Sequence, residues 1–599
     1  MNKISSNIIR YSLLIALVGL GIAAYSQPPT QTKWEAYWIA HPEDKGQDFG
    51  VYLFRKSIDF EQIPQNLNVY VSADNRYKLF VNGQLVAKGP ARDDLAHWRY
   101  ETVDIAPYLI HGRNTVAAQV WNMGEYRPMA QHTLRTGFIL QSDKAELNSN
   151  ETWKVMRDYS IIPLPVDNTK LQTYIVVGPG EITDGNKFPW GWEVGKDNNS
   201  SWVDAKPIDR GTPKGVGTDQ TWQLVPREIP FMEEKIVRFK ECRRIEGAVK
   251  DKNWLNKSDL IIPAKSKATL LLDQGVLNVG YPVMKISGGK NAEITLTYAE
   301  SLTDKEGNKG NRNEILNKEI KGNQDIIISD GEKGREYTTL WLRTFRYVAL
   351  DIVTGDEPLI VEDLYSFFSA YPFEQKAVFK SDQTWINDVL EVGWRTARLC
   401  AGETYFDCPY YEQMQYVGDT RIQALISVYQ TGDARLFKKS IDLFDHSRFD
   451  EGLTRSRYPS YAPQVIPTYS LFWVNMLHDY WMHVPDEEYI KSKLFGIKSV
   501  LDWFDKQVDE KTGLIGNTPY WNFVDWTPEW RWDNEIGQGG VPDLEGGSSI
   551  VSLQYAYSLD AAADLHEYFG EGHEAEKYRS ISQRIKNQVM ISCFDEEKG

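Results

Sequence analysis

The sequence predicts a multidomain fold in which β-sandwich domains are followed by an all-α region. The chain has 599 residues, enough for about three to six domains. Between about residues 30 and 370, short strands alternate with turn residues, which is typical of sandwiches. After Ser381 the apolar residues recur at helical spacing, as Ile386, Val389 and Leu390 do.

The first 26 residues have the pattern of a secretory signal peptide. Basic residues precede the apolar segment 12–24, which is too short to span a membrane. The sequence Ala24-Tyr25-Ser26 fits a small-x-small cleavage site, so we expect the mature chain to start at Gln27. A retained anchor is the alternative. The prediction is a secreted or periplasmic protein with no membrane insertion after cleavage.

The region 27–234 is expected to form the first β-sandwich. Residues 51–60 have the composition of a strand, and 77–81 and 84–87 are two short apolar runs. The Asn-Gly pair at 82–83 joins these runs, and Asn-Gly favours a hairpin because a type I′ turn needs two positive φ angles.

The region 235–372 is expected to form a second β-sandwich. Its clearest strands are 268–272, 292–298 and 345–352. The segment 304–323 is polar and rich in Gly, Asn and Lys, which indicates a long exposed loop.

The region 373–599 is expected to be helical. Ser381 or Asp382 would cap its first helix, and Gly432 and Gly570 would end two later ones. A long Trp-rich loop at 517–547 precedes the sixth helix, and loops of that length usually serve function. The seven predicted helices are 382–401, 419–431, 434–446, 467–484, 486–508, 548–569 and 572–592.

Charge and composition exclude several classes of protein. The net charge is −16, so nucleic acid and anionic membrane surfaces are not expected partners. The 20 Trp, 32 Tyr and 23 Phe suit either sugar binding or aromatic sandwich cores. The four cysteines show no zinc spacing, and whether Cys400 and Cys408 form a bridge stays open. No metal site and no cofactor are predicted.

The segment 405–423 carries the clearest chemistry. It places Asp407, Glu412 and Asp419 among several tyrosines. Aromatic rings can dock a sugar while one protonated carboxyl donates to the leaving oxygen, which is what glycoside hydrolysis needs. The alternative is a structural inter-helix loop in which Asp419 caps the next helix.

This segment resembles the signature of glycoside hydrolase family 78, the α-L-rhamnosidases. The stretches 34–40, 79–83 and 112–114 resemble parts of that family's N-terminal sandwich, and 343–348 resembles the strand before its catalytic domain. The resemblance implies an (α/α)6 barrel, an inverting mechanism and no cofactor.

The resemblance also implies roles for individual residues. Glu412 matches the general acid, and Asp407 and Asp419 match carboxylates that hold the hydroxyls of rhamnose. Tyr416 stands where the family usually has Trp, as a stacking face. Trp526 is similar to an aromatic residue that lines the sugar site.

Two departures from the family pattern affect these expectations. The family's Arg beside the acid is Tyr411 here, which leaves the sugar specificity open. The family's general base lies far downstream, beyond Gly599, and the barrel needs twelve helices where the sequence predicts seven. We therefore expect a truncated chain with an incomplete barrel. A base from the Trp-rich loop is the alternative, and its candidates are Glu529, Glu535 and Glu545.

The function that the sequence favours is a secreted inverting glycosidase that removes terminal α-L-rhamnose from glycans or glycosides. One alternative is a non-catalytic carbohydrate-binding protein or truncated pseudoenzyme. Another is a different (α/α)6 glycosidase, such as an unsaturated uronyl hydrolase. The natural glycan, the aglycone, the oligomeric state and calcium binding are not predicted.

Overall fold

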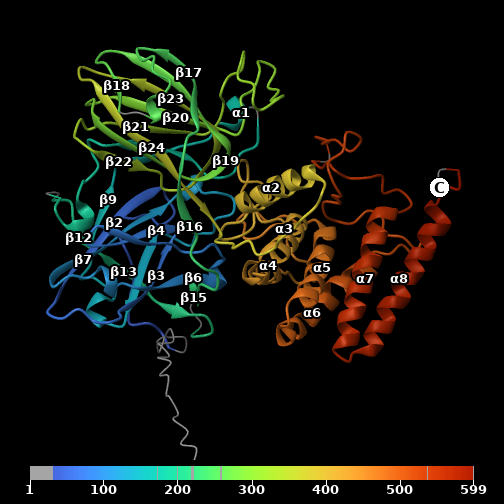
Figure 1. The fold of residues 1–599 in the computed structure, drawn as a ribbon. Helices are drawn as coiled ribbons and strands as arrows, with labels where there is room; N and C mark the ends of the chain where they lie inside the picture. The colour runs from blue at the N-terminus through green and yellow to red at the C-terminus, as the bar shows by residue number, and fades with distance from the viewer. Residues whose placement is uncertain are drawn as a thin grey trace, which may run out of the picture.

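The structure is a computed structural model that describes residues 32–597 except 172, 198–199, 218–220, 257–258 and 536. The predicted signal peptide lies outside the described residues. Two β-rich regions lie at the left of Figure 1, one above the other, and the helices extend from them to the right. The predicted order of sandwiches followed by helices is therefore confirmed. No helix in the described ranges combines the length and apolarity needed to cross a bilayer.

The first β-rich region packs a six-stranded sheet against a seven-stranded sheet. The first sheet contains, in spatial order, β12 (Val203–Asp204), β9 (Lys154–Asp158), β2 (Gly50–Phe60), β7 (Gly112–Asn122), β4 (Arg76–Val81) and β5 (Gln84–Gly89). The second contains β13 (Lys206–Arg210), β1 (Tyr37–Ala40), β8 (Gly137–Ser142), β3 (Asn68–Asp74), β6 (Trp98–Asp104), β15 (Gln223–Pro226) and β14 (Thr212–Pro213).

The hairpin and the aromatic content of this sandwich follow from its sequence. Asn82 and Gly83 both have positive φ, 50° and 83°, so the predicted turn between β4 and β5 is confirmed. Trp38 and Trp222 stack inside the sandwich with ring centroids 4.0 Å apart, and Trp153 is fully buried. Much of the unusual Trp content therefore fills the core.

The second β-rich region is an eleven-stranded sheet organised around the 22-residue strand β19 (Lys267–Gly288). The first half of β19 pairs with β17 and β23, and its second half pairs with β22 and β24. The segment 304–323 contains no helix or strand, as predicted. The other strands are β10 (Ile161–Leu164), β11 (Gly180–Asp184), β16 (Glu233–Arg238), β17 (Glu241–Gly247), β18 (Leu260–Ile262), β20 (Glu293–Ala299), β21 (Gln324–Ile328), β22 (Arg335–Thr338), β23 (Arg343–Val353) and β24 (Leu359–Ala370).

Two strands of this sheet come from early in the chain. β11 pairs in parallel with β21 and antiparallel with β10. The chain therefore enters the second sheet, returns to the first sandwich at β12, and reaches the second sheet again at β16. The connection between β10 and β11 contains the four-residue helix α1 (Asn168–Leu171).

All seven predicted helices are present. Gly432 ends α3 with a φ of 71°, as predicted. Gly570 follows α7 with a φ of 82°. The expected cap of α2 is wrong: its N-cap is Gln383, because Ser381 Oγ accepts from the Gln383 N–H and forms a turn before the helix. The helices are α2 (Thr384–Leu399), α3 (Val417–Thr431), α4 (Arg435–His446), α5 (Pro467–His483), α6 (Glu487–Asp505), α7 (Ser549–Tyr568) and α8 (Gly572–Cys593).

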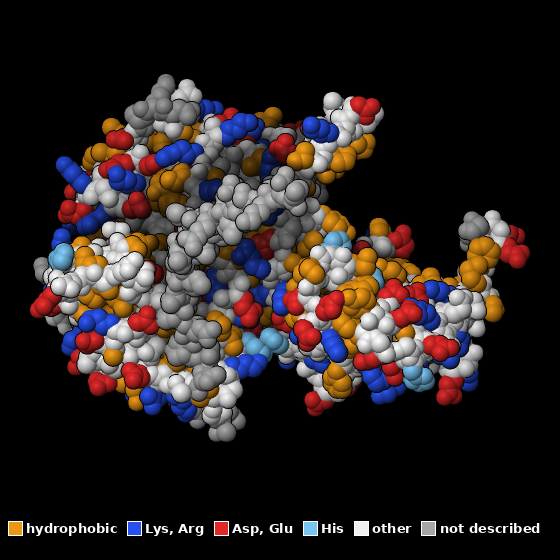
Figure 2. Space-filling model, turned by 60° about the horizontal axis from the view of Figure 1, so that its bottom comes forward, with side chains coloured by type: hydrophobic (Ala, Val, Ile, Leu, Met, Phe, Trp, Pro, Cys, Tyr) orange, Lys and Arg blue, Asp and Glu red, His pale blue; other side chains and the backbone are white. Residues whose placement is uncertain are grey.

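Part of the apolar surface of these helices faces solvent. Trp385, Val389 and Val392 on α2 are 61%, 58% and 60% exposed. These side chains have no packing partner that covers them among the described residues. Elsewhere on the face seen in Figure 2, acidic and basic side chains are interspersed, without one large patch of either sign.

A buried ion pair joins the first sandwich to the helical region. Arg76 on β4 donates two hydrogen bonds of 2.7 Å to the carboxylate of Glu403, just after α2. Arg76 and Arg92 both lie over the ring of Trp341, from the second sheet. Burial alone would raise the pKa of Glu403, but the charge of Arg76 holds that pKa at about 2. This junction fixes the three regions relative to one another.

Candidate active site

The predicted site lies in the loop between α2 and α3, which we call the acid loop (residues 407–413). Its two ends meet, because Asp407 N–H donates to Met414 O at 2.7 Å and Met414 N–H donates to Asp407 Oδ1 at 3.0 Å. Gln413 has a φ of 54°, so the chain reverses there. The reversal brings Glu412 back towards Asp407.

The second β-rich region holds the acid loop from outside. Trp341 Nε1 donates to Gln413 Oε1 at 3.1 Å, and Thr344 Oγ1 donates to the carbonyl of Pro409 at 2.7 Å. Tyr410 donates to the carbonyl of Tyr298 at 3.0 Å. The helical region therefore supplies the carboxylates, and the second β-rich region fixes their backbone.

Asp407 and Glu412 form a pair of half-buried carboxyls. Burial raises the pKa of Asp407 to about 8, and the negative charge of Glu412 adds to that rise. Burial also raises the pKa of Glu412. Two neighbouring buried carboxyls do not both ionise readily, so the pair retains a proton near neutral pH. A retained proton is what a general acid requires.

Tyr416 and Arg457 form a hydrogen-bonded relay to Glu412. Arg457 Nη1 donates to Tyr416 Oη at 2.8 Å, and the Tyr416 hydroxyl donates to Glu412 Oε2 at 3.1 Å. Both groups favour the ionised form of Glu412 and oppose the effect of burial on its pKa. The relay would thus stabilise the carboxylate that remains once the proton has been given up. Tyr416 was expected as a stacking face, and its hydroxyl has this additional contact.

Arg457 was missed by sequence reasoning. It lies far from the acid loop in sequence, and it reaches Tyr416 because the backbone of 456–458 pairs beside 415–417. Tyr411, which stands at the family's Arg position, instead directs its hydroxyl to Glu300 and Lys309. The positive charge near Glu412 therefore comes from Arg457.

Asp419 lies in the first turn of α3, whose N-cap is Tyr416. The reading of Asp419 as the cap is therefore wrong, because the helix begins two residues earlier. Burial raises the pKa of Asp419, and the charge of Asp525 adds to this rise. Asp419 and Asp525 also act together on the pKa of Tyr469, which burial raises in the first place. The second half of the site is thus a group of two carboxylates and a tyrosine.

Trp526 belongs to an aromatic platform in the Trp-rich loop. Its ring centroid lies 5.4 Å from that of Phe523 and 6.2 Å from that of Trp521, and the side chain is 55% exposed. Its neighbour in sequence, Asp525, acts on the pKa of Asp419. An exposed aromatic ring suits stacking on the C–H face of a sugar. The three glutamates suggested as a base, Glu529, Glu535 and Glu545, are all exposed.

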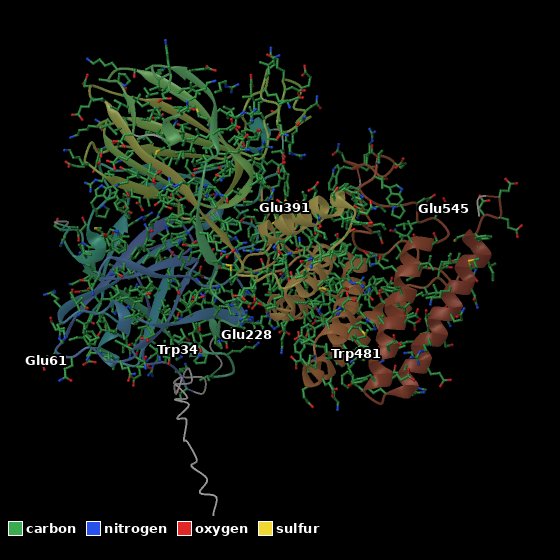
Figure 3. All side chains as sticks on the ribbon, in the orientation of Figure 1. Trp34, Glu61, Glu228, Glu391, Trp481 and Glu545 are labelled. Atoms are coloured by element: carbon green, nitrogen blue, oxygen red, sulfur yellow. The ribbon has the colours of Figure 1, made fainter. Side chains whose placement is uncertain are left out.

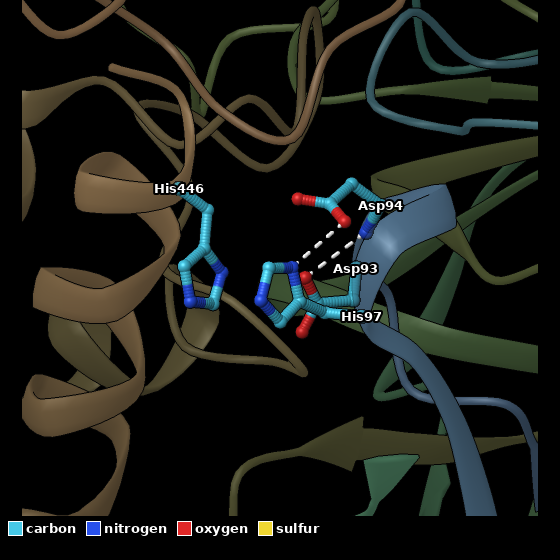
Figure 4. A group of neighbouring side chains, drawn as sticks. All are labelled: Asp93, Asp94, His97 and His446. Carbon is cyan, nitrogen blue, oxygen red and sulfur yellow. Dashed lines mark hydrogen bonds and ion pairs between the residues drawn. The ribbon is translucent and has the colours of Figure 1, made fainter. Parts of the chain in front are cut away.

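A second group of titratable side chains lies where the first sandwich meets α4 (Figure 4). Asp93, Asp94, His97 and His446 offer ligand atoms within 4.8 Å of one another. The His97 and His446 rings stack at 3.4 Å, and Asp94 accepts from His97 Nδ1 and from the Tyr458 hydroxyl. His446 Nδ1 is buried without a hydrogen-bond partner among the described residues, whereas Asp94 and His97 bond to each other. The stacked rings form a contact between the first sandwich and α4. The sequence did not indicate it, since His446 lies far from Asp93, Asp94 and His97 in the chain.

The cysteines are not bridged. Cys400 and Cys408 are both free thiols, and burial raises the pKa of each to about 12. A thiol with so high a pKa is a weak nucleophile at neutral pH.

Comparisons with known proteins agree with this architecture. The bacterial α-L-rhamnosidase concanavalin-like domain matches residues 264–368, and the bacterial α-L-rhamnosidase six-hairpin glycosidase domain matches residues 374–599. Six hairpins contain twelve helices, and α2 to α8 are the seven that the structure describes. No curated protein sequence matches the chain significantly.

Solved structures of rhamnosidases have the same fold. The family 78 rhamnosidase of Bacillus sp. GL1 is 18% identical with a TM-score of 0.79, over 95% of this chain and 78% of that one. The enzyme of Aspergillus terreus is 17% identical with a TM-score of 0.72, over 94% and 62%. The enzyme of Streptomyces avermitilis, solved with L-rhamnose, is 16% identical with a TM-score of 0.67, over 92% and 49%. The chain spans less than two thirds of the last two.

Proposed function

This chain belongs to the bacterial α-L-rhamnosidases of glycoside hydrolase family 78, and we propose that it acts in the inverting removal of terminal α-L-rhamnose from glycans or glycosides. The observation that carries the proposal is the Asp407–Glu412 pair. Burial raises the pKa of both carboxyls, and the charge of Glu412 raises the pKa of Asp407 further. The hydrogen bond from Tyr416 can stabilise the charge left on Glu412.

Each group then has a step in the reaction. Glu412 donates its proton to the oxygen that leaves the sugar. A water molecule forms the new bond to the anomeric carbon from the opposite face, and a base outside the assigned residues takes the proton of that water. Tyr416 and Arg457 stabilise the resulting carboxylate. Asp407 and Asp419 hold hydroxyls of the sugar, and Trp526 provides a face for its ring. We also propose that the protein is secreted or periplasmic, which the apolar segment 12–24 supports.

Hydrolysis of an aryl α-L-rhamnoside by the full-length protein tests this proposal. Glu412→Gln should lower kcat about 10²- to 10⁴-fold, the usual contribution of a general acid, and Glu391→Gln on the exposed side of α2 should not change it. Proton NMR of the first product should show the β anomer if the reaction inverts. Full activity of Glu412→Gln would rule out the assigned acid.

The competing reading is a carbohydrate-binding protein without turnover. The exposed platform at Trp526 would serve it equally well. It predicts saturable rhamnose binding, lost in Trp526→Ala, with no hydrolysis of any rhamnoside.

A further inference from the structure

A cavity of about 180 Å³ lies beside the acid loop, between the first sandwich and the helical region. It is lined from the sandwich side by the turn after β7 and by the connection between β10 and β11. From the helical side it is lined by the segment before α5. The residues used below are Arg127, Met129, Ile175, Val176 and Tyr461.

The cavity adjoins the backbone of the acid loop next to Glu412. Val176 N–H donates to the carbonyl of Tyr411, the residue before Glu412, at 2.8 Å. Tyr174 lies between the cavity and the relay: its hydroxyl contacts Met129 Sδ at 3.7 Å, and Arg457 and Glu412 both act on its pKa, which burial raises.

The position of the cavity relative to the acid decides what it can bind. A general acid protonates the oxygen that joins the terminal sugar to the rest of the substrate, so it stands at the boundary between the two. Asp419 and Asp525 interact electrostatically on one side of the site, and Trp526 follows Asp525 in sequence. The cavity reaches Glu412 through Tyr174 and Val176, which are separate from that group. The cavity is therefore positioned to bind the leaving group, which is attached to the rhamnose through that oxygen.

The lining suits a sugar ring. The Arg127 guanidinium lies 4.2 Å from the Tyr461 ring centroid, and Arg127 Nε is buried without a hydrogen-bond partner among the described residues. Tyr461 is 41% exposed and offers an apolar face. Met129 and Ile175 add apolar contacts, and Glu125 at the rim can accept from hydroxyls. The volume lies below the roughly 300 Å³ at which pockets for drug-sized ligands begin, which leaves room for about one ring.

We propose that this cavity is the subsite for the sugar residue that carries the terminal rhamnose, and that the first sandwich therefore selects the leaving group. The inference rests on the proposed function and adds the class of leaving group to it. Arg127 donates to a hydroxyl of that sugar, and Tyr461 packs on its ring.

Equilibrium binding to the full chain with Glu412→Gln tests the subsite without turnover. The probes are L-rhamnose, an aryl α-L-rhamnoside and a disaccharide with α-L-rhamnose at its non-reducing end. We expect the disaccharide to bind about tenfold more tightly than rhamnose. Adding Tyr461→Ala or Arg127→Met should remove most of that difference. The matched controls Tyr159→Ala and Arg157→Met remove another exposed Arg–Tyr pair (5.1 Å), which does not line the cavity, and should preserve it.

The outcomes separate the two proposals. Equal binding of rhamnose and disaccharide, or an equal loss for both in Tyr461→Ala, would overturn the subsite and leave the proposed function standing. A gain for the aryl rhamnoside alone would overturn the assignment to a sugar. If no rhamnoside binds and the full-length protein hydrolyses none, the proposed function itself fails.

Discussion

Arg457 sets the proton affinity of the acid, although it does not contact the carboxylate itself. Its charge lowers the pKa of Glu412, and its hydrogen bond holds the Tyr416 hydroxyl in place. In Arg457→Met we expect the pKa of Glu412 to rise. Because the proposed role requires a protonated Glu412, the alkaline limb of the kcat profile should move to higher pH. Arg455→Met, two residues away, is the control, and an unmoved limb in Arg457→Met would contradict the relay.

Burial makes ionisation of Asp407 unfavourable in the folded protein, so its replacement by Asn should stabilise the protein. The pKa of Asp407 is about 8 in the folded chain against 3.8 in the unfolded chain. Between these values the folded state binds more protons, so this group lowers the free energy of unfolding as pH rises from about 4 to 8. In Asp407→Asn this loss is absent.

Thermal unfolding measures the effect. The Tm of Asp407→Asn relative to wild type should increase with pH across that window, while sugar binding weakens. Asp433→Asn is the control, since hydrogen bonds from Arg435 outweigh burial and lower the pKa of Asp433. A Tm difference that is constant with pH would show that Asp407 has an ordinary pKa.

Among individual residues, the sequence could indicate those that act within one continuous segment. Asp407, Glu412 and Asp419 lie within thirteen residues of one another, and a single loop brings them together. Arg457 and Tyr174 could not be found in this way. Their places depend on the backbone pairing of 456–458 and on the docking of the β10–β11 connection, which no local pattern specifies.

The helices were predictable because their periodicity and their end signals are local. The path of the sheets was not. β11 pairs with β21 in parallel although some 140 residues separate them in sequence (Ile182 to Ile326). Such pairings depend on contacts between distant segments, so the composition of a strand reveals its presence but not its neighbour.

A glycine that ends one helix and a glycine inside another should respond in opposite ways to replacement by alanine. Gly432 ends α3 at a φ of 71°, and an added Cβ there would meet no atom within 4 Å. Gly432→Ala should therefore cost about 1 kcal/mol of unfolding free energy through backbone strain alone. Gly393→Ala, in an equally open position inside α2, should instead stabilise by up to about 1 kcal/mol. Urea unfolding compares the two variants, and effects of the same sign would contradict this account.

At the scale of the whole molecule, Glu403 is the residue on which the three regions converge. It accepts from Arg76 and from the Arg92 N–H, and its own carbonyl accepts from Lys439. Glu403→Gln would leave two buried arginines without their counter-charge, so we expect a loss of about 3 kcal/mol or more.

The control for Glu403 is an exposed ion pair on the same helical region. Glu391 and Arg395 lie one turn apart on α2, and Glu391 is labelled on that helix in Figure 3. Glu391→Gln should cost less than about 0.5 kcal/mol. Chemical unfolding measures both variants. A similar loss of unfolding free energy in the two would show that the buried charges at the junction do not stabilise the protein.

The two hydrogen bonds that hold Gln413 limit how domains can be exchanged between related proteins. Arg92 and Trp341, from the two β-rich regions, both bond to Gln413, next to the acid. In a chimera joined at residue 373, the acid loop of this chain would meet the β-rich regions of a relative, whose contact residues match a different loop. Exchange should succeed only when the partner brings along the equivalents of Arg92, Trp341 and the β10–β11 connection. The acid loop should therefore be exchanged together with the residues that bond to it. A junction at the domain boundary separates them.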